Sequence, residues 1–205
     1  MIDGSKISDR SVAADMFNKY FTNIGPDLAT KIDSSNKKSF DSYLTNIHNF
    51  SFEFEFSSPE IVAKAIDKLK PKTSCGHDNI SSKLLKFIKD VISAPISIIV
   101  NQSLYTGIFP NKLKLAKVLP LFKKGGNELM ENYRPISLLP AISKIFERIV
   151  FDQLYKYLHS NNLLYKSQYG FRKKHSTEMA SLELIDRIYN DLDNKNTPVA
   201  IYLDL

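Results

Sequence analysis

Apolar residues recur along most of this chain at intervals of three and four, the spacing of an amphipathic helix. The first run follows Ser11 and is closed by Gly25-Pro26. A later run starts at Ser58-Pro59, an N-cap residue followed by a proline at the first helical position. The pattern predicts helices over residues 13–24, 59–69, 84–104 with a break near Pro95, 140–160, and 177–192 after an N-cap at Ser176.

Four other segments have the patterns of β-strands. Phenylalanines alternate with polar residues over 50–56, which predicts a short edge strand with one apolar face. The runs 118–122 and 133–139 flank a polar tip and predict a hairpin with basic residues at both shoulders. The run 198–205 is nearly all apolar, as expected for a buried central strand with one acid, Asp204, close to its end.

Composition restricts the class of protein. The chain has 205 residues, of which 43% are hydrophobic and 24% charged, values typical of a soluble globular protein. Its longest apolar stretch, 94–100, is far shorter than the roughly 20 residues that span a bilayer, and the N-terminus lacks a signal-peptide pattern. We therefore expect an intracellular protein without a membrane partner, in either nucleus or cytoplasm. The single cysteine, Cys75, can form neither an internal disulfide nor a thiolate zinc site.

The polar stretch 33–49 is a candidate linker, so we expect an N-terminal helix and linker over 1–49 and a separate domain over 50–205. Positive charge is concentrated within this second region. Thirteen Lys or Arg and four acids lie between residues 112 and 174, so this segment carries +9 and the rest of the chain −3. A basic stretch with interleaved aromatic residues suits a surface that binds phosphate backbones, and the alternative is a solvated helix face.

Three motifs occur in an order that resembles non-LTR retrotransposon reverse transcriptases of the jockey and CR1 kind. Residues 133–140 read Tyr-Arg-Pro-Ile-Ser-Leu-Leu-Pro, residues 168–172 read Gln-Tyr-Gly-Phe-Arg, and residues 200–205 read Ala-Ile-Tyr-Leu-Asp-Leu. Upstream, the segments 76–80, 101–110 and 118–125 are similar to the part of this family that leads into the polymerase domain. The resemblance covers residues 17–205, and its specificity lies in the ordered set of motifs.

The resemblance implies an α+β, mostly helical fold: the fingers and the start of the palm of a right-hand polymerase, with an incomplete palm sheet. It implies an RNA-directed DNA polymerase that binds an RNA template, a DNA primer and a dNTP. The family uses two Mg²⁺ ions held by oxygen ligands. One carboxylate corresponds to Asp204, and two come from a later Tyr-x-Asp-Asp hairpin that these 205 residues do not contain. We therefore expect the chain to be inactive alone, and its oligomeric state stays open.

The resemblance also assigns roles to individual residues. Asp204 corresponds to the catalytic metal ligand, although a strand-end acid exposed at a terminus is the plain alternative. Arg134 corresponds to the arginine of the fingers that binds the triphosphate of the incoming nucleotide through bidentate hydrogen bonds. Lys123 and Lys124, across the predicted hairpin, are candidates for the outer phosphate, and the alternative for both is a solvated lysine.

A second set of roles falls on the Gln-x-Gly-Phe-Arg segment, which in this family supports the template strand and the nucleotide pocket. Gly170 would allow close backbone approach, and we expect Phe171 to be anchored in the core whatever the function. The cationic end of the segment would contact template phosphates. The residues predicted to bind template are Gln168, Gly170, Phe171, Arg172, Lys173 and Lys174.

Three functions remain open from the sequence. The first is a fragment of a mobile-element reverse transcriptase. The second is a non-catalytic nucleic-acid-binding module derived from a retroelement. The third is an interaction protein that uses its basic face for an acidic partner.

Overall fold

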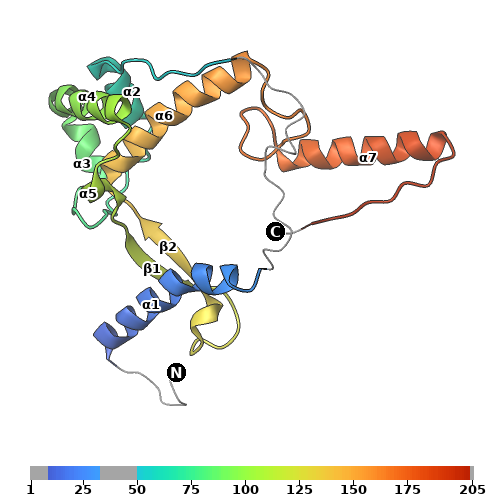
Figure 1. Ribbon diagram of the computed structural model, residues 1–205, viewed down its shortest axis with the longest axis horizontal. Coiled ribbons are helices and arrows are strands. Elements are labelled where there is room, and N and C mark those ends of the chain that lie inside the picture. The colour runs from blue at the N-terminus through green and yellow to red at the C-terminus, as the bar shows by residue number, and fades with distance from the viewer. Residues whose placement is uncertain (1–8, 33–49, 204–205) are drawn as a thin grey trace. The chain divides into compact units, whose positions relative to one another are not determined.

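The computed structural model describes residues 9–32 and 50–203 (Figure 1). These residues fall into two compact units, Met1–Leu154 and Tyr155–Leu205, and each is described by itself. No described helix combines the length and the apolar character needed to cross a membrane. In chain order the elements are α1 (Arg10–Ala29), α2 (Pro59–Asp67), α3 (Ser82–Phe87), α4 (Lys89–Thr106), α5 (Asn111–Lys114), β1 (Lys117–Phe122), the 3-10 helix η2 (Met130–Asn132), β2 (Tyr133–Leu138), α6 (Ala141–Ser160) and α7 (Thr177–Asp193).

The core of the first unit lies among α2, α3, α4 and α6. Phe146 of α6 is almost fully buried and meets the ring of Phe109 edge to face, with 5.3 Å between the centroids. The prediction of an apolar stripe on α6 is confirmed for its first half, because Ile145 and Ile149 are also buried. The buried hydrophobic residues are Val62, Ala65, Ile66, Leu85, Ile96, Val100, Ala141, Ile145, Phe146 and Ile149.

The predicted hairpin is confirmed. Strands β1 and β2 pair antiparallel, with Phe122 opposite Tyr133 and Leu121 opposite Arg134. Within the first unit the hairpin leads away from α2–α6, and α1 lies across its far end (Figure 1). There Phe17 of α1 meets the Tyr133 ring at 4.9 Å, so α1 braces the hairpin through aromatic contacts.

Two predicted helix ends are wrong, and both involve proline. Helix α1 continues through Gly25-Pro26 to Ala29, because the missing N–H of Pro26 affects only its last turn and the Pro26 carbonyl still accepts from Thr30. Pro95 lies inside α4, and the break comes instead at Ile88, whose backbone (φ −99°, ψ 15°) leaves the helical region. The predicted end at Gly107 is confirmed, since this glycine has the left-handed conformation (φ 69°).

The strand predicted for 50–56 is wrong, although its end is held in an extended path by two helical side chains. The Gln153 amide accepts from Glu55 N–H (2.8 Å) and donates to the Glu55 carbonyl (3.1 Å). Asn101 does the same for Ser57, at 2.8 and 3.0 Å. These carboxamides supply the hydrogen bonds that a neighbouring strand would give, so no β-ladder forms.

A charged cluster joins α2 to α6. Lys68 Nζ and Arg148 Nε lie 3.0 and 3.1 Å from Oδ2 of Asp152. Partial burial raises the pKa of Asp152, but the hydrogen bonds from Lys68 and Arg148 outweigh it, so this pKa lies below its ordinary value. A carboxylate with a lowered pKa stabilises the fold above its unfolded-state pKa, and this contribution is lost as the pH falls through the folded-state value.

We expect Asp152→Asn to lower the free energy of unfolding at pH 7 by a few tenths to about 1 kcal/mol, the range of partly exposed ion pairs. The difference from the wild type should disappear in strong acid, where Asp152 is protonated. Urea denaturation at pH 7, 4 and 2.5 measures it. The control is Asp15→Asn, at an exposed position without an ion pair to any described residue. This substitution should change the free energy of unfolding little at any pH. A difference that does not shrink between pH 7 and pH 2.5 would contradict the linkage.

In the second unit the predicted helix is confirmed, and the predicted strand is not. Helix α7 begins after Ser176, whose hydroxyl accepts from the Met179 N–H at 3.3 Å. Most of its large apolar residues are exposed, Leu182 by 65%, and Ile188 is half-buried. Residues 198–203 form no strand, and Val199, Ile201 and Leu203 are each more than 80% exposed. An isolated strand has no ladder hydrogen bonds, and the described residues provide no partner strand for this one.

Candidate nucleic-acid interface

The hairpin brings Lys123 and Arg134 to the same face. Arg134 lies opposite Leu121, and Lys123 is two residues beyond Leu121, so the alternation of side chains along a strand places both cations together. Lys123 continues the ladder past the last strand pair, since its N–H donates to the Asn132 carbonyl at 2.8 Å. Lys124 follows at the start of the tip.

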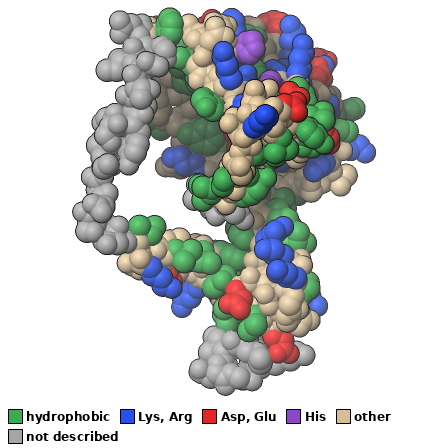
Figure 2. Space-filling model, turned by 90° about the vertical axis from the view of Figure 1, so that its right-hand side faces the viewer, with side chains coloured by type: hydrophobic (Ala, Val, Ile, Leu, Met, Phe, Trp, Pro, Cys, Tyr) green, Lys and Arg blue, Asp and Glu red, His purple; other side chains and the backbone are tan. Residues whose placement is uncertain are grey.

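These three cations are exposed and available to a ligand. Lys123, Lys124 and Arg134 form no ion pair with any described residue. The other residues on the Arg134 face include Leu119 and Ile136, which are 43% and 41% exposed. This face of the hairpin therefore combines cations with uncovered apolar side chains. Figure 2 shows the same mixture more widely, with Lys and Arg interspersed among apolar side chains on the visible surface.

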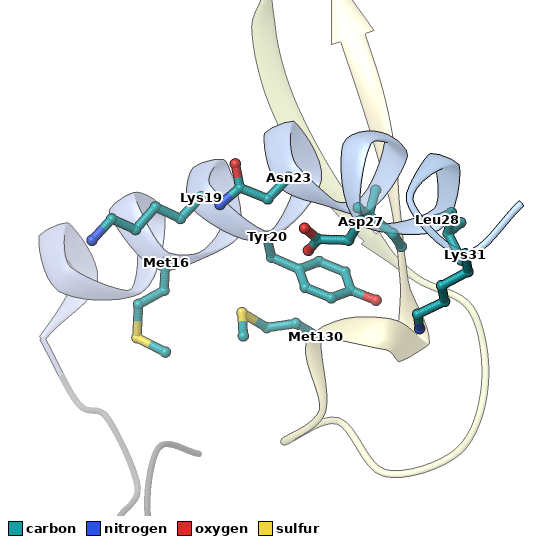
Figure 3. Close-up of a pocket in the computed structure, with 9 residues that line it drawn as sticks. Met16, Lys19, Tyr20, Asn23, Asp27, Leu28, Lys31 and Met130 are labelled. Carbon is teal, nitrogen blue, oxygen red and sulfur yellow. The ribbon is translucent and has the colours of Figure 1, made fainter. Parts of the chain in front are cut away.

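The tip end of the opposite face of the hairpin carries a group of packed aromatic rings. Phe122 and Tyr133 meet edge to face at 5.5 Å, and Phe17 packs on Tyr133. A hollow lies between α1 and η2, and its lining includes Met16 and Tyr20 of α1 and Met130 of η2 (Figure 3). Helix α1 contacts the hairpin at Tyr133, on the face opposite Arg134, and Arg134 itself is exposed.

The tip of the hairpin is fixed by side-chain hydrogen bonds. Asn132 donates from its amide to the Gly126 carbonyl (2.8 Å), and the Tyr133 hydroxyl donates to the Asn127 carbonyl (2.7 Å). Gly125 has a left-handed backbone (φ 87°), and a Cβ there would lie 2.8 Å from the Asn132 amide nitrogen. These contacts hold the chain around Lys124 in one conformation.

The second cationic segment, 168–174, lies in the second unit and is closed by Arg172. One guanidinium nitrogen of Arg172 donates to the Tyr165 carbonyl at 3.0 Å and lies 3.4 and 3.5 Å from two further loop carbonyls. The Gln168 amide donates to the Gly170 carbonyl at 3.3 Å. Arg172 therefore holds the loop in shape through these hydrogen bonds. Its contact with the template stays a prediction.

Phe171 is not anchored in the core, contrary to our expectation. Its side chain is fully exposed and its backbone is left-handed (φ 61°). Tyr169 faces His175 instead, at 5.5 Å between ring centroids. A Cβ on Gly170 would meet no atom within 4 Å, so the packing of this chain does not require glycine there, and close approach by a ligand stays a prediction.

Of the remaining predicted residues, the structure describes Lys173 and Lys174 but not Asp204. Lys173 places its amine 4.9 Å from the ring centroid of Tyr155, and Lys174 is exposed with a left-handed backbone. Asp204 lies outside the described residues. In the described part of the chain no three Asp, Glu, His or Cys side chains cluster as metal ligands would.

One group of cations was not predicted from the sequence. Lys70 and Lys72 lie outside the basic segment 112–174, yet they line the same cavity as Lys144 of α6. The signal in the sequence was the Lys-Pro-Lys tripeptide directly before the 73–79 turn, together with Lys144, which the helical pattern leaves off the buried face of α6.

Similarity to known proteins extends over most of the chain. The chain is 33% identical over 147 residues to the probable RNA-directed DNA polymerase from transposon BS of Drosophila melanogaster. The aligned residues are 71% of this chain and 16% of that protein. The chain is 28% identical over 164 residues to the RNA-directed DNA polymerase from mobile element jockey of the same species, covering 80% of this chain and 18% of that protein.

A third relative is the probable RNA-directed DNA polymerase from transposon X-element of D. melanogaster, 30% identical over 70% of this chain and 16% of that protein. No protein-family model matches the chain. The chain spans less than a fifth of the length of these curated relatives. The motifs in 133–140 and 168–172 had indicated the same group of proteins, and the similarity confirms it: this chain is related to a segment of the RNA-directed DNA polymerases of non-LTR retrotransposons.

Proposed function

We propose that this chain is part of a mobile-element RNA-directed DNA polymerase and binds an RNA template, a DNA primer and a deoxynucleoside triphosphate. The observation that carries this proposal is the open hairpin face, where Arg134 and Lys123 lie together without acidic partners among the described residues. A guanidinium binds a phosphate through two parallel hydrogen bonds, and a neighbouring amine adds a point charge. Such a face suits a triphosphate.

In this proposal the hairpin and its supporting helices form the fingers of a right-hand polymerase, and residues 198–205 begin the palm. Residues 1–49 precede the polymerase domain, which starts at residue 50. The contact between Phe17 and Tyr133 supports a bracing role for the preceding helix. The 168–174 loop contributes exposed Phe171 and Lys174 for template bases and phosphates.

Asp204 is the proposed metal ligand, acting with two carboxylates from a segment of the polymerase outside these 205 residues. Magnesium, when bound, activates the primer 3′-hydroxyl and stabilises the leaving pyrophosphate. The chain contains no Tyr-x-Asp-Asp sequence. It therefore supplies binding and positioning, and we expect it to be inactive alone.

Binding and chemistry are tested separately. We expect the chain to bind a labelled RNA template–DNA primer duplex in fluorescence anisotropy, with an affinity that falls steeply as KCl rises. We expect no primer extension when magnesium and deoxynucleotides are added. Extension would contradict the proposal that the missing carboxylates are required. Absence of binding even at low salt would contradict the proposed function and favour an acidic protein partner.

The role of Arg134 is tested by Arg134→Ala, measured as equilibrium binding of a labelled dNTP to the chain with primer–template present. Loss of a bidentate, charge-assisted contact should weaken binding by about 10- to 100-fold, from roughly 1.5–3 kcal/mol. Arg10→Ala, at an exposed position near the start of α1, is the matched control. The matching nucleoside should bind both variants equally. An unchanged dNTP affinity in Arg134→Ala would refute the assigned role.

A non-catalytic nucleic-acid-binding module is the second candidate, because the exposed cations of the hairpin face suit the phosphates of a nucleic-acid backbone as well as a triphosphate. It predicts the same salt-dependent binding of nucleic acid. It differs in predicting that Arg134→Ala leaves nucleotide binding unchanged, since a clamp without chemistry has no use for a triphosphate.

A further inference from the structure

A small basic cavity lies at the junction of β2 and α6. It has a volume of about 220 Å³ and is bordered by the 69–76 segment, the start of α3 and the first residues of α6. None of the residues assigned above to nucleotide, template or metal lines it. The lining consists of Leu69, Lys70, Lys72, Ser74, Cys75, Gly76, Ser82, Leu139, Ala141 and Lys144.

The floor of the cavity is built by Ser82. This side chain is almost fully buried, donates its hydroxyl hydrogen bond to the Lys70 carbonyl (2.7 Å) and accepts from the Lys72 N–H (3.0 Å). The Lys72 carbonyl in turn accepts from the Lys83 N–H at 3.2 Å. The backbone carrying both lysines is therefore fixed on the start of α3, so their side chains leave from defined positions.

Every charged residue in the lining of the cavity is a lysine. Lys70, Lys72 and Lys144 are exposed, no acid lines the cavity, and none of the three amines forms an ion pair with a described residue. Helix α6 starts here with no acid in its first turn, so the positive end of its dipole adds to the lysines. Three amines around one cavity repel each other unless an anion offsets their charge.

We infer that this cavity binds a phosphate group of the nucleic-acid backbone, at a position separate from the hairpin face. The inference rests on the proposed function, because it requires that the chain binds nucleic acid. Lysines are point charges that attract phosphates without contacting the bases. They therefore suit a site that holds the backbone of a strand whatever its base sequence. Since β2 ends at Leu138 and the cavity begins at Leu139, one continuous segment carries both Arg134 and the edge of the cavity.

The first test compares the triple variant Lys70→Gln, Lys72→Gln, Lys144→Gln with a control of equal charge change, Lys64→Gln, Lys83→Gln, Lys195→Gln. None of the control lysines lines the cavity. Binding of the labelled primer–template is measured by anisotropy over a series of KCl concentrations. The plot of log affinity against log salt should lose about 0.7–0.9 in slope in the cavity variant, for the one phosphate contact that the cavity makes, and much less in the control.

The second test uses Cys75, the single cysteine of the chain, which lies in the cavity lining. Its rate of alkylation by a small maleimide should fall when primer–template is added to the wild type. Protection should be lost in the cavity variant and kept in the control. Competition with dATP or inorganic phosphate distinguishes a backbone phosphate, which we expect, from a free one.

The outcomes separate the two proposals. If the wild type binds primer–template but the cavity variant matches the control in slope and Cys75 reactivity, the cavity inference is overturned and the proposed function stands. If dATP or inorganic phosphate alone protects Cys75 as well as primer–template does, the assignment to backbone phosphate is overturned. If the wild type fails to bind primer–template, both proposals fall.

Discussion

Asn101→Leu should lower the free energy of unfolding by about 2–6 kcal/mol, because it leaves two buried backbone groups without partners at roughly 1–3 kcal/mol each. Ser57 has no solvent exposure, and the Asn101 carboxamide both accepts from its N–H and donates to its carbonyl. Leucine is similar in size to asparagine and offers neither bond. Water cannot replace them at a fully buried residue, so the desolvation cost falls on the folded state.

Gln153→Leu is the matched control for this prediction. Gln153 makes the same pair of hydrogen bonds to the backbone of Glu55, which is exposed, and its amide also donates to the buried Ser57 hydroxyl at a longer distance of 3.4 Å. Water can hydrogen-bond to the backbone N–H and carbonyl of Glu55 after the substitution. The free energy of unfolding should therefore fall by at most about 0.5–1.5 kcal/mol per hydrogen bond. Urea denaturation followed by far-ultraviolet circular dichroism gives both values. Equal losses in the two variants would show that burial of Ser57 does not set the cost.

These two carboxamides also explain why the sequence was misleading at 50–56. The alternation of phenylalanine with polar residues is typical of a strand, yet Phe56 is 74% exposed and Phe50 51%. The segment gains its hydrogen bonds from side chains 44 and 98 residues away in the chain. A local pattern contains no information about such distant partners, so a strand and an extended segment held by carboxamides are indistinguishable in the sequence.

The hairpin and the long helices could be predicted because their signals are local. Turn residues at 125–126 separate two apolar runs, and the register of those runs places Arg134 beside Lys123 without any distant contact. Phe171 could not be placed in the same way. Its exposure follows from a left-handed backbone in a loop closed by Arg172, which depends on the path of the whole loop. Asp204 lies outside the described residues, so its role as metal ligand stays a prediction.

The basic cavity could not be predicted from the sequence for a related reason. Its lysines lie at 70, 72 and 144, and no local pattern brings these positions together. They meet because the chain around residue 76 packs directly against the junction between β2 and α6. The residue that permits this approach is Gly76, which the family resemblance had marked without a physical reason.

Gly76→Ala should destabilise the fold by about 1–3 kcal/mol or more, the cost of forcing extra volume into packed structure. An added Cβ would lie 2.8 Å from Pro140 N and 3.0 Å from both Leu139 C and Pro140 Cα. All three are backbone atoms at the start of α6, so no side-chain rotation relieves the clash. The junction must shift, which moves Lys144 away from Lys70 and Lys72.

Gly126→Ala is the control, since a Cβ there meets no atom within 4 Å and its φ lies outside the left-handed region. We expect a change of less than about 0.5 kcal/mol for it, as for most surface substitutions. Because Gly76→Ala opens the cavity as well as weakening the fold, Cys75 in the folded variant should react faster with maleimide and lose its protection by primer–template. A Gly76→Ala protein with wild-type stability and wild-type Cys75 reactivity would show that the 76–140 contact can relax. The close approach would then not be what holds the three lysines around one cavity.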